Sequence, residues 1–351
     1  MFDGQLKDLE RISQAVGNSP DLVQGGGGNT SVKLDDTRMA VKASGYKLKE
    51  ITPTEGYVVV HYKNIREYHQ NVDLSEDRDY EKESGEFVRA NIIPMEGLKP
   101  LRPSVEAGFH SILMKHVIHT HPVYANMICC CKHGKELADR IFASKEYGFV
   151  WIPYINPGFM LTLSMLQEVS AYKQEQGKFP QVIFMENHGL VVTADTADAA
   201  ISLHEDVNHT IRQYFHMDEP YPSVRIEAAG DGTFKSKTQY LTDYFKGRDM
   251  TMSFFDDMAL YPDQLVYLNG NIAVNESTQK LNINTVTGEI IYKTNEKEAL
   301  TMEETLLGFI FVVESIRKNN LPLKTMSDKE TAFIRNWESE KYRKSLVSTN
   351  H

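Results

Sequence analysis

Hydrophobic residues along the first two thirds of the chain alternate between a helical and a strand-like spacing. Leu6, Leu9 and Ile12 recur at three-residue intervals, which predicts an opening helix that ends near Gly17. Runs of β-branched and aromatic residues bounded by turn residues predict strands. These runs are RMAVKA from Arg38, YVVVHY from Tyr57, HVIHTH from His116, FVWIPY from Phe149 and QVIFM from Gln181.

Helical spacing returns between these strands. Helices are predicted after Pro103, near 124–142, near 160–174 and from about Thr196 to His216. The polar, charge-rich residues 64–98 are expected to form a surface-exposed segment outside the regular strands and helices. Because alternating strands and helices are typical of layered α/β domains, the pattern predicts an α/β fold for this part of the chain.

The composition changes at residues 217–235, which are rich in proline, glycine, aspartate and serine, as in a connection. The 351 residues also exceed the ~100–200 residues of a common domain. We therefore predict a first domain over 1–220 and a smaller C-terminal accessory α+β domain over 236–351. In the latter, strands are expected at DQLVYLNG, KLNINT and EIIYKT, and helices from about Met302 and Ser327. It has no dense polar cluster, so chemistry is expected in the first domain.

Charge and composition limit the classes of ligand and partner that this protein is expected to bind. A net charge of −10 argues against nucleic acid, which needs clustered lysine and arginine, and favours a small-molecule ligand. The longest apolar run, LLGFIFVV, has eight residues where a membrane span needs ~20, and the charged first ten residues do not resemble a secretory signal. We expect a cytoplasmic protein without membrane contact. The consecutive Cys129, Cys130 and Cys131 are interpreted as reduced, apolar filler in a buried helix or strand.

Two histidines in VIHTHP form a candidate metal site. His119 and His121 are two positions apart, so on a strand they point to the same face. Zinc is held by nitrogen ligands at ~2.0–2.1 Å with one position left open for substrate, so a third ligand is needed. His188 in MENHGL is the candidate because it follows an apolar strand. The alternative is a chance pair of histidines on a solvated strand edge.

Glu106 in RPSVEAGFH has two interpretations. In one, Ser104 caps a helix and the carboxylate of Glu106 complements the helix dipole. In the other, Glu106 is a general acid or base whose helix packs beside the histidine strand. Spacing alone leaves both open.

The stretch QGGGGNTS, residues 24–31, also has two interpretations. Successive glycines allow a backbone to approach a ligand closely, and their N–H groups can bind an anion together with Asn29, Thr30 and Ser31. A flexible linker is the alternative, but linkers rarely lead directly into a strand. The stretch lacks the spacing of a Walker loop or a dinucleotide fingerprint. The phosphate of a small substrate is the ligand that remains.

Five motifs in fixed order, GGGGNTS, KASG, RPSVE, HTHP and ENHGL, resemble the class II aldolase/adducin family over roughly residues 5–216. The resemblance implies a three-layer α/β/α fold and an enzyme that cleaves or rearranges small phosphorylated sugars, commonly as a homotetramer. It implies Zn²⁺ or another divalent metal on His119, His121 and His188, with Glu106 as the acid/base. It places the substrate phosphate against Gly28, Asn29, Ser44, Gly45 and Ser104.

Within this family, the motif sequences RPSVE, HTHP and WIPYINPGF resemble those in the aldolase half of bifunctional rhamnulose-phosphate aldolase/lactaldehyde dehydrogenases. The final WESEKYRKSL resembles the segment before their dehydrogenase half, and no dehydrogenase is expected here. Val105 stands where the fuculose-phosphate aldolases have a second serine, which weakens the implied phosphate grip.

The resemblance implies a retro-aldol reaction of a ketose phosphate that gives dihydroxyacetone phosphate and an aldehyde. The same residues can serve a 4-epimerase or a dehydratase. An adducin-like binding module would have lost the metal site, and the intact histidines and Glu106 argue against it.

Overall fold

The computed structural model describes residues 2–336, so the predicted resemblance of WESEKYRKSL lies outside the described residues. Within this range, eight strands form the larger sheet in the order β4-β3-β2-β1-β5-β8-β7-β6. Neighbouring strands are antiparallel except for the parallel pair β6 and β7. The strands are β1 (Asn29–Lys33), β2 (Met39–Lys42), β3 (Tyr57–Val60), β4 (Ile92–Ile93), β5 (His116–Thr120), β6 (Phe149–Ile152), β7 (Val182–Met185) and β8 (Gly189–Ala194).

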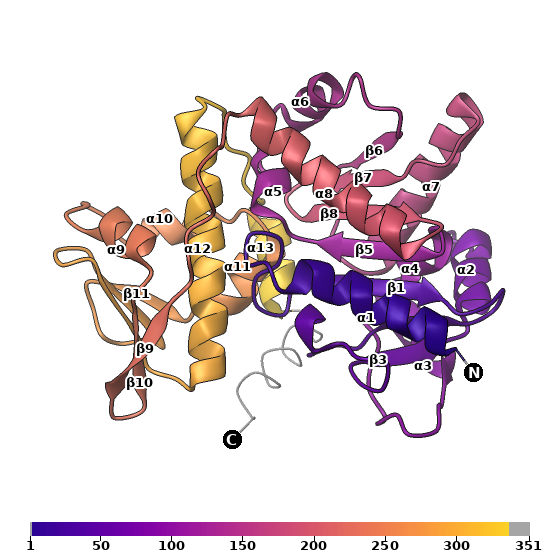
Figure 1. Cartoon of the computed structure of the whole chain (residues 1–351), viewed down its shortest axis with the longest axis horizontal. Coiled ribbons are helices and arrows are strands. Elements are labelled where there is room, and N and C mark those ends of the chain that lie inside the picture. The colour runs from indigo at the N-terminus through magenta and orange to yellow at the C-terminus, as the bar shows by residue number, and fades with distance from the viewer. Residues whose placement is uncertain (1, 337–351) are drawn as a thin grey trace.

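Helices cover both faces of this sheet and give the expected three-layer α/β/α fold (Figure 1). Successive residues of β5 point to opposite faces of the sheet. Ile118 packs into the core on one face, and Val117 packs into the core on the other. The Ile118 face carries α1 (Asp3–Gly17), α5 (Val123–Cys129), α6 (Gly134–Ile141) and α8 (Ala197–Tyr214). The Val117 face carries α2 (Tyr62–Asn71), α3 (Tyr80–Ala90), α4 (Ala107–Ile112) and α7 (Phe159–Gln176).

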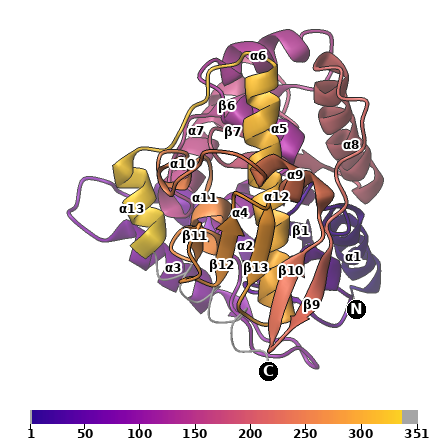
Figure 2. The same cartoon turned by 90° about the vertical axis from the view of Figure 1, so that its left-hand side faces the viewer.

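The C-terminal part holds a second sheet, of five strands within the described residues, in the order β11-β12-β13-β10-β9. Its long helix α12 stands between this sheet and the larger one, as Figures 1 and 2 both show. Its strands are β9 (Ile226–Gly230), β10 (Thr233–Ser236), β11 (Ile272–Val274), β12 (Leu281–Asn284) and β13 (Glu289–Tyr292). Its helices are α9 (Gln239–Phe245), α10 (Ser253–Asp256), α11 (Pro262–Tyr267), α12 (Glu296–Lys318) and α13 (Asp328–Asn336).

One hydrophobic core joins the two parts of the chain. Leu306, Phe309 and Val313 of α12 are fully buried in the same cluster as Ile128 of α5 and Leu9 of α1. The C-terminal part therefore packs directly on the layer that covers one face of the larger sheet. The division at 220 and 236 stays a prediction.

Several predicted elements differ from the structure. DQLVYLNG was expected as a strand but belongs to α11, where Pro262 at the first turn favours a helix start. Residues 64–98 contribute most of α2, all of α3 and the short β4, because Ile65 and Val88 supply buried contacts that the polar composition conceals. The connection at 217–235 contains β9 and most of β10, and α12 begins at Glu296, ahead of the expected Met302. Strand β8 was not predicted.

Cys129, Cys130 and Cys131 are buried at and after the end of α5, as expected for apolar filler. Burial raises the pKa of all three thiols, so they are poor nucleophiles at neutral pH. Among residues 2–336, no helix is long and apolar enough to cross a membrane.

Candidate metal and acid–base site

The three predicted histidines meet in one buried cluster. His119 is in β5, His121 follows the end of that strand, and His188 lies in the turn from β7 to β8. A ligand atom from each lies within 4.8 Å of the other two. Gly189 makes this close approach possible, because a β-carbon there would lie 2.4 Å from the Thr120 carbonyl oxygen. The alternative of a solvated strand edge is wrong, since all three side chains are buried.

The Nε2 atoms of the histidines face a common point. His119 Nε2 lies 3.2 Å from His121 Nε2. On the Glu106 carboxylate, Oε2 lies 3.4 Å from His119 Nε2, and Oε1 lies 3.3 Å from His188 Nε2. The Nδ1 atoms of two of these rings contact oxygen atoms outside the cluster. His119 Nδ1 lies 3.0 Å from the Leu190 carbonyl oxygen, and His121 Nδ1 lies 2.5 Å from Asp263 Oδ2.

This donor set fits a divalent metal. Two nitrogens bound at ~2.0–2.1 Å to a tetrahedral zinc would be about 3.3 Å apart, close to the separation of His119 and His121. Burial lowers the pKa of His119 well below its ordinary value, although Glu106 opposes the shift, so the imidazole is neutral and can donate a lone pair. Within residues 2–336, Glu106 Oε1 is a buried atom with no hydrogen-bond partner. A cation bound by the three imidazoles would also offset the nearby negative charge of Glu106.

Glu106 is placed beside the histidines by the start of α4. The helix begins at Ala107 and Glu106 itself is the N-cap residue, so the interpretation of Ser104 as N-cap is wrong. The Ser104 hydroxyl instead accepts from the Glu106 N–H at 3.3 Å. Burial acts to raise the pKa of Glu106, but His119, His188 and the Asn29 amide outweigh it and hold the pKa well below its usual value. A buried, ionised carboxylate is therefore available as a base.

A polar chain behind Glu106 fixes its orientation. Asn29 Nδ2 donates to Glu106 Oε2 at 2.6 Å and to Ser104 Oγ at 3.0 Å. Asn29 Oδ1 contacts His110 Nε2, and His110 Nδ1 contacts Ser31 Oγ at 2.7 Å. Burial lowers the pKa of His110 to about 3, so its neutral ring can donate to Asn29 while accepting from Ser31. The structure thus ties Asn29 to Glu106, and its contact with a phosphate stays a prediction.

Ser44, Gly45 and Ser104, three of the residues predicted to bind the phosphate, lie on two segments that run side by side. Ala43 pairs with Pro103, the Ser44 N–H donates to the Arg102 carbonyl oxygen at 2.8 Å, and the Ser104 N–H donates to the Lys42 carbonyl oxygen at 3.1 Å. The motifs KASG and RPSVE are therefore adjacent, and both serines line one cavity. Gly45 has a φ of 90°, a conformation that glycine adopts without strain.

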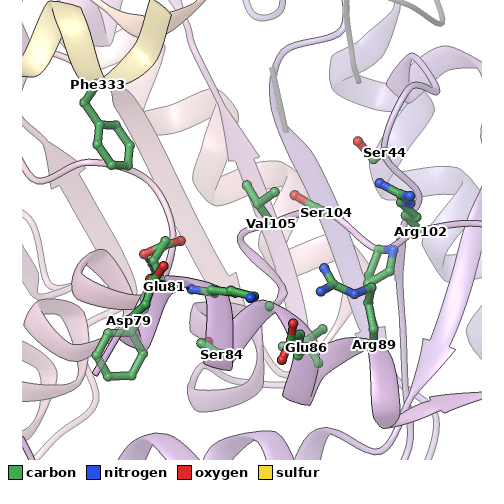
Figure 3. A pocket seen from close by; sticks show the side chains of 15 residues that line it. Ser44, Asp79, Glu81, Ser84, Glu86, Arg89, Arg102, Ser104, Val105 and Phe333 are labelled. Atoms are coloured by element: carbon green, nitrogen blue, oxygen red, sulfur yellow. Dashed lines mark hydrogen bonds between the residues drawn. The ribbon is translucent and has the colours of Figure 1, made fainter. Parts of the chain in front are cut away.

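This cavity, of about 590 Å³, adjoins the Glu106 site through Ser104 and Val105 (Figure 3). Arg89 of α3 and Arg102 lie on the same side of the cavity as Ser44 and Ser104, and Phe333 of α13 lies across from them. The arginines supply positive charge that sequence reasoning missed. Arg89 lay in the segment expected to be a surface excursion, and no motif pointed to it.

The glycine run packs beside the histidine cluster and is not a flexible linker. Gly28 has a φ of 68°, and a β-carbon there would lie 2.5 Å from the His119 carbonyl oxygen. Glycine at this position lets the chain pass directly against β5, the strand that carries His119. The Gly25 N–H is already donated to a carboxylate of the protein, Glu304 Oε2, at 2.9 Å. It is therefore engaged within the protein instead of lining an open anion site.

The comparisons with known proteins agree with this architecture. Residues 8–215 match the family model of the class II aldolase and adducin N-terminal domain, and the chain belongs to that family. The N-terminal class II aldolase domain of a conserved protein from Thermoplasma acidophilum has a similar fold. Its TM-score is 0.50 at 24% sequence identity, and the match covers 61% of this chain and 95% of that structure.

Two curated relatives carry different names. The uncharacterized oxidoreductase YuxG of Bacillus subtilis is 27% identical over 235 residues, covering 63% of this chain and 32% of the relative. The chain thus spans about a third of the length of that relative. The 3-oxo-tetronate 4-phosphate decarboxylase of Haemophilus influenzae is 24% identical over 207 residues, covering 55% of this chain and 79% of the relative.

Proposed function

We propose that this protein is a metal-dependent lyase that cleaves a ketose phosphate by a retro-aldol reaction to dihydroxyacetone phosphate and an aldehyde. The observation that carries the proposal is a buried cluster of three histidines beside the Glu106 carboxylate, which lies 3.3–3.4 Å from the Nε2 atoms of His188 and His119. Membership of the class II aldolase and adducin family supports it.

His119, His121 and His188 would hold the metal, and Zn²⁺ is the ion we propose. A bound divalent ion supplies a Lewis acid that polarises a substrate carbonyl. Glu106 is proposed to take the proton of the substrate hydroxyl at C4 as the C3–C4 bond breaks. It then returns this proton to C3 of the ketone fragment, so the carboxylate is regenerated. Asn29 keeps the carboxylate oriented during both transfers.

The phosphate of the substrate is proposed to enter the cavity beside Glu106. Ser44 and Ser104 line one side of it, and Arg89 and Arg102 bring charge to the same side. Gly28, Asn29 and Gly45 are proposed to complete the phosphate site. Guanidinium groups bind phosphate oxygens in pairs. The arginines therefore support an anionic substrate on their side of the cavity, whose lining also includes Asp79, Glu81 and Glu86. Val105 replaces the second serine of the fuculose-phosphate aldolases.

A decarboxylase is a second candidate, because one relative is named a 3-oxo-tetronate 4-phosphate decarboxylase. Decarboxylation of a 3-oxo acid also breaks a carbon–carbon bond one carbon away from a ketone carbonyl. In both reactions the fragment that contains the ketone keeps the electron pair and becomes an enolate. An epimerase or a dehydratase would use the same metal and base. We also expect a homo-oligomer, with a tetramer favoured.

A screen of ketose phosphates and 3-oxo acid phosphates against zinc-loaded protein tests the proposal. We expect release of an aldehyde and dihydroxyacetone phosphate from at least one ketose phosphate. Glu106→Gln should retain zinc, because Glu106 is not a proposed ligand, and should lose kcat by ~10²–10⁴-fold. Release of carbon dioxide alone would favour the decarboxylase. Turnover of none of the substrates by fully zinc-loaded protein would favour a binding module.

A further inference from the structure

Helices α11 and α12 of the C-terminal part pack against the glycine run, next to the histidine cluster. A β-carbon at Gly25 would lie 2.8 Å from Thr301 Cγ2 of α12, and one at Gly26 would lie 2.8 Å from the Tyr267 hydroxyl of α11. At Gly27 it would lie 2.2 Å from Asp263 Oδ2. Three successive glycines therefore let α11 and α12 approach the backbone more closely than any side chain would permit.

This close packing brings Asp263 to the cluster formed by His119, His121 and His188. Asp263 is in the first turn of α11, is fully buried, and accepts a hydrogen bond from His121 Nδ1 at 2.5 Å. It lies outside residues 8–215, the part of the chain that matches the family. A buried carboxylate costs several kcal/mol of desolvation unless a partner offsets it, and His121 supplies that partner.

The contact decides which nitrogen of His121 is available. An ionised carboxylate only accepts hydrogen bonds, so the Nδ1 atom of His121 carries the proton and Nε2 carries the lone pair. This Nε2 atom is the one that lies 3.2 Å from His119 Nε2. The Leu190 carbonyl oxygen holds His119 in the same way, but it is a neutral group. Asp263 adds a negative charge, which makes the imidazole a stronger donor.

We propose that Asp263, contributed by the C-terminal part of the chain, is a positioning residue that orients His121 and raises its affinity for the metal. The inference rests on the metal site of the proposed function. It also gives residues 236–351 a direct role, because α11 completes a site that otherwise belongs to the first part of the chain. A purely structural role for Asp263, as a bond that docks α11, is the competing explanation.

Zinc dissociation constants measured by competition with a chromophoric chelator separate these roles. Asp263→Ala should bind zinc about 10–100-fold more weakly than wild type, as is usual when the hydrogen-bond partner of a metal-ligating histidine is lost. The isosteric Asp263→Asn should show a smaller loss, because its amide oxygen can still accept from His121. Thermal unfolding of the metal-free proteins establishes that each variant is folded.

Glu304→Gln is the matched control. Glu304 accepts a hydrogen bond from the Gly25 N–H of the same glycine run and pairs with Lys47 at 3.4 Å, and it bonds to none of the three clustered histidines within residues 2–336. We expect its zinc affinity to stay within about twofold of wild type. Equal zinc affinity in wild type and both Asp263 variants would overturn the positioning role, and so would an equal loss in Glu304→Gln. A wild-type protein that binds no zinc would overturn the metal site together with this inference.

Discussion

Replacement of Asn29 by alanine should lower catalytic turnover more than substrate binding. The side chain makes a 2.6 Å hydrogen bond to the Glu106 carboxylate, and it also contacts Ser104 and His110. A hydrogen bond to a charged group contributes about 1.5–3 kcal/mol. If this energy keeps Glu106 in its reactive orientation, its loss corresponds to about a 10–100-fold lower kcat.

The assay compares kcat and KM of Asn29→Ala for a phosphorylated substrate and for its unphosphorylated analogue. We expect a similar fall in kcat for both, because the lost contact is with Glu106. Thr30→Val is the matched control, since Thr30 is the next residue of β1, is equally buried, and bonds to Ser13 on the other face of the sheet. It should lose stability without a change in kcat.

The opposite kinetic pattern would refute this reasoning. An Asn29→Ala protein with unchanged kcat and a raised KM for the phosphorylated substrate alone would show that the amide binds phosphate instead of orienting Glu106. Metal content should match wild type in either case, because the side-chain hydrogen bonds of Asn29 go to Ser104, Glu106 and His110, and Asn29 pairs with His119 only through the strand backbone.

Three further results are expected. Arg89→Ala should raise KM for the phosphorylated substrate about tenfold or more and leave KM for the unphosphorylated analogue unchanged, whereas equal effects would remove Arg89 from the phosphate site. Burial raises the pKa of Glu81 to about 7, above its value in the unfolded chain, so the folded protein holds a proton on this carboxyl that the unfolded chain releases at lower pH. As the pH rises from about 5 to 8, wild type should therefore lose stability relative to Glu81→Gln. After allowance for partial exposure the difference is on the order of 2 kcal/mol, and parallel unfolding curves across this pH range would contradict it. Elemental analysis should find zinc in wild type and little in the doubly substituted His119→Ala/His121→Ala protein, and equal content would end the assignment of these ligands.

Local patterns were sufficient to predict most of the large sheet and the centre of the site. His119 and His121 are two positions apart on a strand, and Glu106 opens the helix that covers the same face, so short-range spacing carries this geometry. Strand β8 was missed because all six of its residues are buried, and a short apolar run without alternation has no distinctive period. The same ambiguity turned α11 into an expected strand.

Long-range contacts account for the rest. Asp263 is 142 positions from His121 and stands in an apolar stretch, so no local pattern marks it as part of the site. Arg89 is exposed on a polar helix and gains its place only when α3 packs beside the cavity. The glycine run was predicted to belong to the site from its sequence, but its contact with α11 and α12 depends on how the C-terminal part docks.

Hydrogen exchange at dihydroxyacetone phosphate tests the central assignment of Glu106 most directly. The ketone product is incubated in deuterated water with zinc-loaded wild type, with metal-free protein and with zinc-loaded Glu106→Gln, and deuterium at C3 is followed by NMR. We predict exchange of one C3 hydrogen by the zinc-loaded wild type without any aldehyde present, and none above background by the other two proteins. Exchange by Glu106→Gln at the wild-type rate, or no exchange by the zinc-loaded wild type, would contradict the proposed lyase mechanism.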